Sequence, residues 1–251
     1  MVENDIVVKV QRVVLDPRMS LKQFAKFCTA SVRARETVLQ KSKYPGGYIP
    51  KYHEIARKII CETFSANFDD HELYFEEFTR HAVSLRKEAM DFPVKTDDYK
   101  NRAYSASALE SMVRISGLIA PFLKTYVLEN NLRKRMDSIT IAEVKLGAMS
   151  DMICYTDSGL TLAGFIKFNF TSTVLKKEEA AHMLFVLRNF TQSKHAVEVE
   201  PRHCILVDVV AAKVYQGIDT NYLTSSIQSI CTEIKDRWND IQPPLKKEDR
   251  L

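Results

Sequence analysis

Several features that would classify a protein at once are missing from this 251-residue sequence. There is no run of 18 apolar residues, and the first residues show no charged segment followed by an apolar stretch and a small-residue cleavage site. There is also no Gly-x-Gly-x-x-Gly, no Walker-type loop and no Gly-x-Ser-x-Gly elbow, so nucleotide hydrolysis and serine-hydrolase chemistry lose their usual sequence support. We therefore expect a cytoplasmic globular protein with no membrane partner.

Paired cysteines are missing as well. The five cysteines are odd in number, form no Cys-x-x-Cys pair and have no histidine near them at zinc-ligand spacing. The six histidines show no ligand spacing among themselves either, so we expect none of them to be catalytic. We expect the cysteines to be reduced and mostly buried: Cys28, Cys61, Cys154, Cys204 and Cys231.

Basic residues are concentrated near the N-terminus. Residues 1–60 contain 12 Lys and Arg against 5 Asp and Glu, whereas the rest of the chain contains 24 against 27. A basic segment attracts polyanions, although a solvated helical face explains the same charges. Basic and aromatic residues occur together here, which indicates a nucleic-acid-binding segment made of Arg33, Arg35, Lys41, Lys43, Tyr44, Tyr48 and Lys51.

Hydrophobic periodicity divides the chain into a helical first part and a second part that contains a sheet. A strand is predicted over Ile6–Leu15, and a short helix begins at Ser20. Further helices cover 51–66, 70–89 and 101–131, and the last of these is kinked at Pro121. Alternation then predicts strands over 139–146, 160–170 and 198–210, with helices over 177–190 and 223–238. The prediction is an α+β protein with a mainly helical N-terminal region (1–100), a mixed β-sheet core flanked by helices (101–242) and a flexible tail (243–251).

The segment with the most chemical content is residues 146–170. A turn containing glycine leads Asp151 into a short apolar strand, and a tight turn then leads to a second strand that contains Lys167. If Gly159 adopts the left-handed conformation in a three-residue loop, Asp151 pairs with Phe165 and Lys167 lies on the same face. An acid and a lysine side by side can bind a divalent metal and polarise a phosphate, but a hairpin with two solvated charges fits the same pattern.

Other charged residues could extend this pair. Glu143 and Lys145 form an acid-x-lysine pair on the preceding strand, where charges that face water from an edge strand are the alternative. Roughly 30 Å of helix separates Glu110 from the end of the long helix. If that helix lies antiparallel on the sheet, Glu110 comes close to Asp151 along the strand direction. The alternative is that Glu110 is a solvated helix residue. The candidate catalytic residues are therefore Asp151, Lys167, Glu110, Glu143 and Lys145, with Asp151 as the metal ligand.

From Glu110 to Phe190 this arrangement resembles the restriction-endonuclease-like PD-(D/E)XK superfamily, in particular its RecB-type branch. In that family a strand ending in glycine leads to the metal-binding aspartate, and a hairpin return contains an acid-x-lysine triplet. Residues 146–151 and 165–167 look like these two elements. The next helix of that branch often has a Gln and a Tyr that touch DNA, where this chain has His182 and Phe185.

One position departs from the family pattern, because Phe165 stands where the metal-binding acid belongs. Either the acid has migrated, with Glu143, Glu178 or Glu179 as donors, or the domain is a degenerate relative that binds without cutting.

Asp208, within an otherwise apolar strand, needs a partner such as a lysine or a helix N-terminus.

The resemblance implies a metal-dependent nuclease that hydrolyses DNA phosphodiesters, or an inactive relative of one. Its acids would bind Mg²⁺, and its lysine would steady the attacking water or the developing phosphorane charge. Two alternatives stay open: a non-catalytic nucleic-acid-binding subunit, and an assembly module that forms a homo-oligomer or binds a protein partner. Such domains also resemble components of bacterial antiphage systems.

Overall fold

The structure is a computed structural model, and it describes residues 12–46, 52–132, 137–156, 159–218 and 221–244. Apart from a two-residue strand at Arg18–Met19, a mainly helical first part precedes the strands of the sheets, so the predicted α+β class is confirmed. The strand predicted over Ile6–Leu15 lies mostly outside the described residues, and residues 12–15 form no strand.

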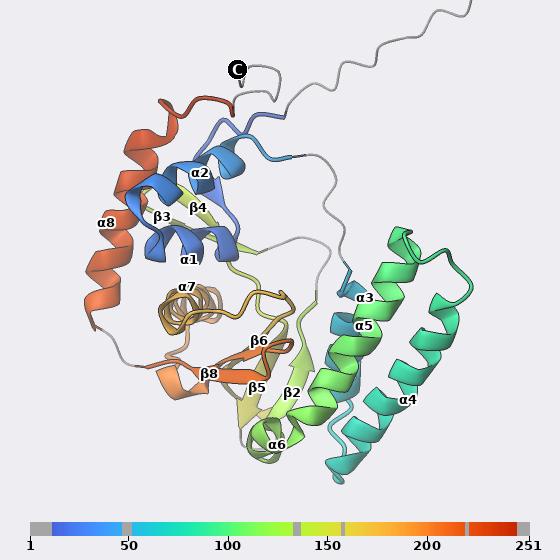
Figure 1. The fold of residues 1–251 in the computed structure, drawn as a ribbon. Helices are drawn as coiled ribbons and strands as arrows, with labels where there is room; N and C mark the ends of the chain where they lie inside the picture. The colour runs from blue at the N-terminus through green and yellow to red at the C-terminus, as the bar shows by residue number, and fades with distance from the viewer. Residues whose placement is uncertain (1–11, 47–51, 133–136, 157–158, 219–220, 245–251) are drawn as a thin grey trace, which may run out of the picture.

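A mixed sheet of order β2-β5-β6-β7-β8 lies at the centre of the molecule (Figure 1). β6 pairs antiparallel with β5 and parallel with β7, while β2 and β8 pair antiparallel with β5 and β7. A parallel connection requires a crossover, and helix α7 (Lys177–His195) supplies it between β6 and β7. The strands are β2 (Val127–Asn130), β5 (Met152–Thr156), β6 (Thr161–Asn169), β7 (Cys204–Asp208) and β8 (Lys213–Gln216).

A smaller sheet joins β1 (Arg18–Met19), β4 (Val144–Gly147) and β3 (Ser138–Ile141) in the order β1-β4-β3. The single strand predicted over 139–146 is therefore a β3–β4 hairpin. Ala142 and Glu143 connect the two strands with φ of 42° and 64°, as both central residues of a type I′ turn require. Neither residue is a glycine or asparagine, so no typical turn residue marks this position in the sequence.

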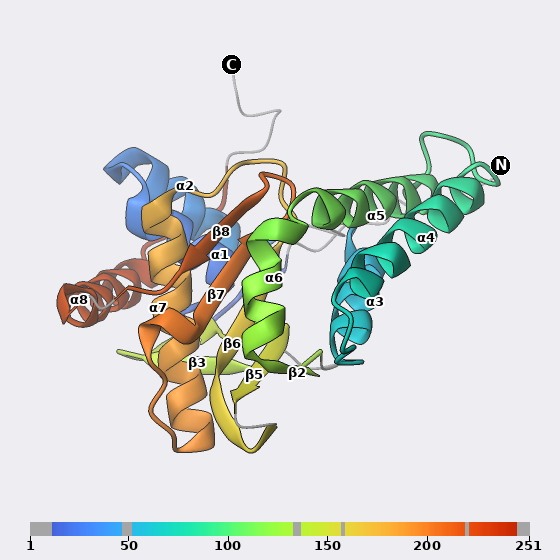
Figure 2. The same ribbon diagram turned by 90° about the horizontal axis from the view of Figure 1, so that it is seen from below.

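Helices cover both faces of the central sheet (Figures 1 and 2). Side chains of the central strands alternate between two hydrophobic cores, as the period of two requires: Phe165 faces one core and Ile166 the other. The core on the Phe165 side includes residues of α1 (Leu21–Thr29), α2 (Val32–Lys43), α7 and α8 (Asn221–Trp238). The other core includes residues of α3 (Glu54–Phe64), α4 (Glu72–Ala89), α5 (Asp97–Arg114) and α6 (Ser116–Thr125). Each core thus contains residues from both sides of the proposed division at residue 100.

The long helix predicted over 101–131 is wrong in two respects. The chain bends by 74° between α5 and α6, whereas Pro121 lies inside α6. Residues 127–130 form strand β2 instead of continuing the helix, because they pair with β5. Within the described part of the chain, no single helix is long and apolar enough to cross a membrane, and only the bent α5–α6 pair taken together passes on length and composition.

Candidate functional site

Asp151 lies immediately before β5 and its side chain is completely buried. Its Oδ1 accepts a hydrogen bond from Lys167 Nζ at 3.1 Å, and its Oδ2 accepts one from the backbone N–H of Phe168 at 2.7 Å. The Nε atom of Arg57, on α3, lies 3.7 Å from the same Oδ1. One buried carboxylate therefore lies between two cations from separate elements.

The expectation that Asp151 and Lys167 share a face of the hairpin is confirmed, but the register differs. The β5–β6 ladder places Asp151 opposite Lys167 instead of Phe165. The loop between the paired strand ends is longer than three residues, and β6 has a bulge with Ala163 as the extra residue, so the pairing shifts by two positions. A shift of two positions preserves the face, because side chains alternate with a period of two. Gly159 has a φ of 91°, in the expected left-handed region.

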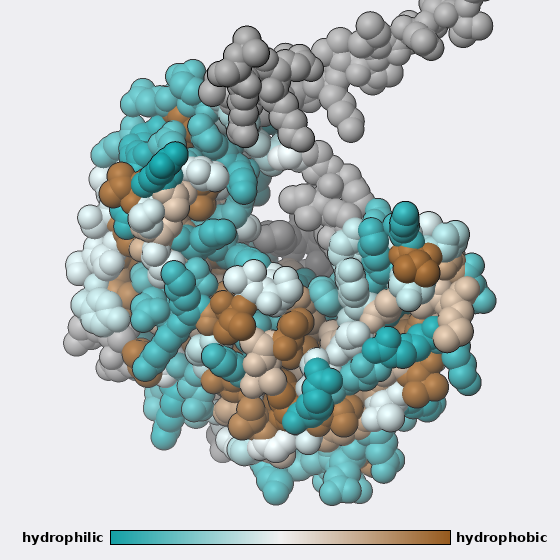
Figure 3. Space-filling view, in the orientation of Figure 1, coloured by the Kyte–Doolittle hydropathy of each residue, from teal (hydrophilic) through white to brown (hydrophobic). Residues whose placement is uncertain are grey.

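Lys167 forms part of the wall of a cleft. A pocket of about 370 Å³ lies between the start of α1, the start of α3 and the end of β6. A second pocket of about 730 Å³ extends from it along α5, and five residues line both. In the space-filling view the surface is hollowed between α1 on one side and α3 with α5 on the other (Figure 3). The residues that line both pockets are Lys22, Tyr52, His53, Phe170 and Thr171.

Basic side chains outnumber acidic ones along this cleft. The basic lining residues are Lys22, Arg57, Arg114 and Lys167, and the acidic ones are Glu54 and Glu110. Asp151 carries one negative charge against the two positive charges of Arg57 and Lys167 beside it. The surplus charge that faces the cleft is therefore positive.

Lys167 is largely shielded from solvent. The side chain of Lys167 is 13% exposed. Burial lowers the pKa of its ammonium group, Asp151 opposes that shift, and the nearby Arg57 adds to it. A buried ammonium without a counter-charge is costly, so Asp151 stabilises the charged lysine at this position.

Aromatic rings line the part of the cleft next to these charges. The ring of His53 stacks between those of Tyr104 and Phe170, with centroid distances of 6.0 Å and 5.6 Å. Tyr52 meets the Tyr104 ring edge-on at 5.4 Å. Burial lowers the pKa of His53, and the Arg57 charge acts in the same direction. The imidazole is therefore a neutral member of an aromatic stack near pH 7.

Glu110 does not join Asp151. Its carboxylate binds the guanidinium of Arg86 on α4, at 2.6 Å to Nε and 2.7 Å to Nη2, and this contact lowers the pKa of Glu110. The sequence estimate assumed one helix lying along the sheet, but α5 ends at Arg114 and packs against α4. Glu110 lines the larger pocket as one half of an ion pair.

Glu143 and Lys145 also lie apart from Asp151, which corrects the expectation that they extend its site on a common strand face. Glu143 is a turn residue and forms an ion pair with Lys235 of α8. Lys145 is exposed on β4, and its backbone N–H donates to the carbonyl of Pro17.

The other proposed donors of a migrated acid do not supply one beside Asp151 either. Glu179 accepts hydrogen bonds from the Lys176 N–H and the Thr29 hydroxyl, so it caps the start of α7 and ties it to α1. Glu178 lies on the exposed first turn of the same helix.

The predicted basic segment needs correction, because part of it fastens α2 to α8. Lys43 is buried, and its Nζ donates to three carbonyls at the end of α8 and just after it, at 2.8 to 3.3 Å. The Tyr44 hydroxyl donates to the carbonyl of Ile241, and Arg35 forms an ion pair with Glu233. Arg33 and Lys41 are exposed on α2, whereas Tyr48 and Lys51 lie outside the described residues.

The residues around Asp151 do not fit a magnesium site as they are arranged. Magnesium requires near-octahedral oxygen coordination, usually through one or two carboxylates. Both oxygens of Asp151 already accept hydrogen bonds, and Phe165 at the family's acid position is completely buried. Across the described ranges, no three His, Cys, Asp or Glu side chains come together in a group that could bind a metal ion.

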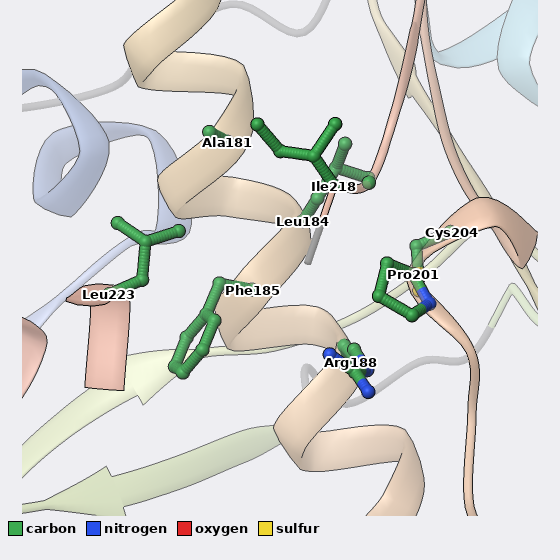
Figure 4. Close-up of a pocket in the computed structure, with 9 residues that line it drawn as sticks. Ala181, Leu184, Phe185, Arg188, Pro201, Cys204, Ile218 and Leu223 are labelled. Carbon is green, nitrogen blue, oxygen red and sulfur yellow. The ribbon is translucent and has the colours of Figure 1, made fainter. Parts of the chain in front are cut away.

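The positions that the resemblance assigned to DNA contact lie elsewhere. Phe185 lines a gap between α7, the start of β7 and the start of α8, with Arg188 and Leu223 among its neighbours (Figure 4). The volume of this gap is about 10 Å³, room for roughly one water molecule, so it is a packing defect and no ligand site. His182 is on α7, and its Nδ1 contacts the carbonyl of Glu178.

Asp208 has hydrogen-bond partners, as expected for a carboxylate in an apolar strand. Its oxygens accept hydrogen bonds from the side chain of Asn169 and the backbone N–H of Leu175. The carboxylate therefore joins the end of β6 to the segment that leads into α7.

Sequence reasoning missed Arg57, Lys22 and Tyr104 as members of the cleft. Arg57 and Tyr104 lie within helices α3 and α5, where a polar or aromatic residue has many ordinary explanations, and the partner of Arg57 is far away in the sequence. A scan against models of known protein families found no matching family, and a search of curated proteins found no similar protein. Functional inference for this chain therefore depends on the geometry of the cleft.

Proposed function

We propose that this chain is a nucleic-acid-binding relative of the PD-(D/E)XK proteins whose catalytic acids are incomplete. The observation that supports this most is the convergence of Lys167 and Arg57 on one buried carboxylate at the wall of a basic cleft. The carboxylate orients both cations and neutralises only one of them. The remaining positive charge suits a phosphodiester, because phosphate neutralisation supplies most sequence-independent nucleic-acid affinity.

The proposal assigns binding to the cleft instead of to α2. Lys22, Arg57 and Lys167 supply the positive charge that binds the phosphates. The protein is proposed to act in the cytoplasm. Affinity is expected to fall steeply as salt is raised, since bound phosphates release counterions.

Fluorescence anisotropy with a labelled oligonucleotide in low salt without divalent ions tests the assignment. The double variant Lys22→Met/Arg57→Gln is expected to bind about 10-fold more weakly and to reduce the slope of log Kd against log salt by roughly 1 to 2. Lys58→Gln is the matched control, because Lys58 neighbours Arg57 on α3 and its side chain is 70% exposed. Equal losses in the control and the double variant, or no binding by the wild type, would reject the proposal.

Nuclease activity is the second candidate, and the contact between Lys167 and Asp151 favours it. Incubation of the protein with DNA and RNA in Mg²⁺ and in Mn²⁺ is the test. Because no three His, Cys, Asp or Glu side chains among the described residues form a group that could bind a metal ion, the expected result is no cleavage above that of the Asp151→Asn and Lys167→Met variants. Cleavage by the wild type that both variants abolish would establish the nuclease and overturn the incomplete-acid proposal.

A further inference from the structure

The larger pocket of the cleft has an aromatic wall that phosphate binding does not explain. Tyr104, on α5, is 44% exposed although it is a large aromatic residue. The ring of His53 lies stacked against it with an interplanar angle of 25°, and Phe170 continues the stack behind His53. A supported ring that is open to the cleft provides a flat surface on which another ring can stack.

The dimensions and neighbours of this pocket match a nucleotide. Its volume of about 730 Å³ lies within the range of small-molecule sites, roughly 300 to 1,000 Å³. Arg114 of α5 lines it together with Tyr104, so a cationic hydrogen-bond donor lies in the same pocket as the aromatic surface, and the Ser111 hydroxyl holds the guanidinium by accepting a hydrogen bond from its Nη2 at 2.6 Å.

The phosphate-binding part lies directly beside this aromatic part. Lys22 lines both pockets, and Lys167 and Arg57 line the smaller one. A strand whose phosphates lie against these cations can therefore place a base in the larger pocket. Bases in a duplex are stacked on one another and unavailable for this contact, whereas an unpaired strand can turn a base toward an aromatic ring.

We infer that the cleft takes single-stranded nucleic acid, with an unpaired base stacked on Tyr104 and the adjoining phosphates beside Lys22, Arg57 and Lys167. This inference rests on the proposed nucleic-acid-binding function and adds to it the class of nucleic acid and the residue that selects it.

The test compares a labelled oligothymidylate of about 12 nucleotides with a GC-rich duplex of the same length. Tyr104→Ala is expected to weaken binding to the single strand about 5- to 100-fold, the loss of one base stack, and to leave duplex binding and the salt slope unchanged. Tyr104→Trp is expected to retain the affinity for the single strand. Tyr222→Ala is the matched control, because Tyr222 is 65% exposed on α8 and does not line the cleft.

A single 2-aminopurine in the strand reports stacking itself. Its fluorescence is expected to be quenched on binding to the wild type and to Tyr104→Trp but not to Tyr104→Ala. Circular dichroism and thermal unfolding of each variant show whether the fold is retained, and Tyr104→Trp keeps the test decisive if Tyr104→Ala is unstable.

The possible results separate the two levels of the proposal. Equal binding of single strand and duplex, with no effect of Tyr104→Ala, overturns the single-strand inference and leaves nucleic-acid binding intact. Competition by thymidine monophosphate as effective as competition by the strand also overturns it, because the occupant is then a nucleotide. Absence of binding to either probe overturns both levels.

Discussion

At the scale of single residues, Asp151 contributes most to the proposed site although it contacts no solvent. Its two oxygens accept hydrogen bonds from Lys167 and from a backbone N–H, and Arg57 lies beside them. A buried ion pair adds little net stability, but removal of one partner leaves the other charge unpaired. The pair therefore acts as a positioning device for the cleft cations.

Asp151→Ala is expected to lower the free energy of unfolding by about 3–5 kcal/mol, because Lys167 then lacks a counter-charge in a buried position. The double variant Asp151→Ala/Lys167→Met is expected to lose less than the sum of the two single variants, with a coupling of about 0.5–3 kcal/mol. Urea denaturation measures all of these values. Glu143→Ala is the control acid, because its side chain is 73% exposed and a solvent-exposed ion pair adds little to stability. Additive losses at Asp151 and Lys167 would show that the two do not depend on each other.

His53 provides a pH-dependent test at the same scale. Its pKa is lowered in the folded protein by burial and by Arg57, so the unfolded chain binds the proton first as pH falls below about 6.5. Stability is therefore present above this pH and is lost on acidification. The pKa of His203 is lowered as well, chiefly by burial, so the wild type has a second histidine with the same effect.

The variant His53→Phe retains an aromatic ring between Tyr104 and Phe170 but cannot take up a proton. Thermal unfolding between pH 7.5 and about pH 5 is expected to show a smaller loss of stability in this variant than in the wild type. Identical pH profiles would mean that protonation of His53 does not affect the fold.

At the scale of secondary-structure elements, sequence predicts the features that local residue patterns determine and fails at those that depend on tertiary contacts. The β5–β6 hairpin, the helix after it and the shared face of Asp151 and Lys167 all follow from alternation, a glycine and helical periodicity. β2 was mistaken for helix because its strand state depends on pairing with β5, a tertiary contact. The break between α5 and α6 was missed because apolar residues recur through both helices.

Helix α2 shows how a basic element can serve the fold instead of a ligand. Lys43→Met is expected to lower the free energy of unfolding by about 1.5–3 kcal/mol, because three carbonyls at the end of α8 lose a charged donor. Lys41→Met removes the same charge from an exposed position on α2 and is expected to change stability by less than about 0.5 kcal/mol. Chemical denaturation of the two variants distinguishes these outcomes, and equal stability of both would contradict the capping role of Lys43.

At the scale of the whole molecule, the cleft is formed by segments from distant parts of the sequence. The starts of α1 and α3, the side of α5 and the end of β6 all contribute to its walls. Both hydrophobic cores position these segments, because α1 packs on the α7 side of the sheet and α3 with α5 on the other. Sequence could predict the Asp151 and Lys167 pair from one hairpin, but Arg57, Lys22 and Tyr104 reach the cleft only through tertiary packing.

Hydrogen exchange of the protein with and without a bound oligothymidylate tests the location of the binding surface most directly. The account predicts slower exchange at the start of α3, along residues 104–114 of α5 and over residues 167–173 when the strand is bound, with α2 and α8 unchanged. Protection confined to α2, where the basic segment was first expected, would contradict it.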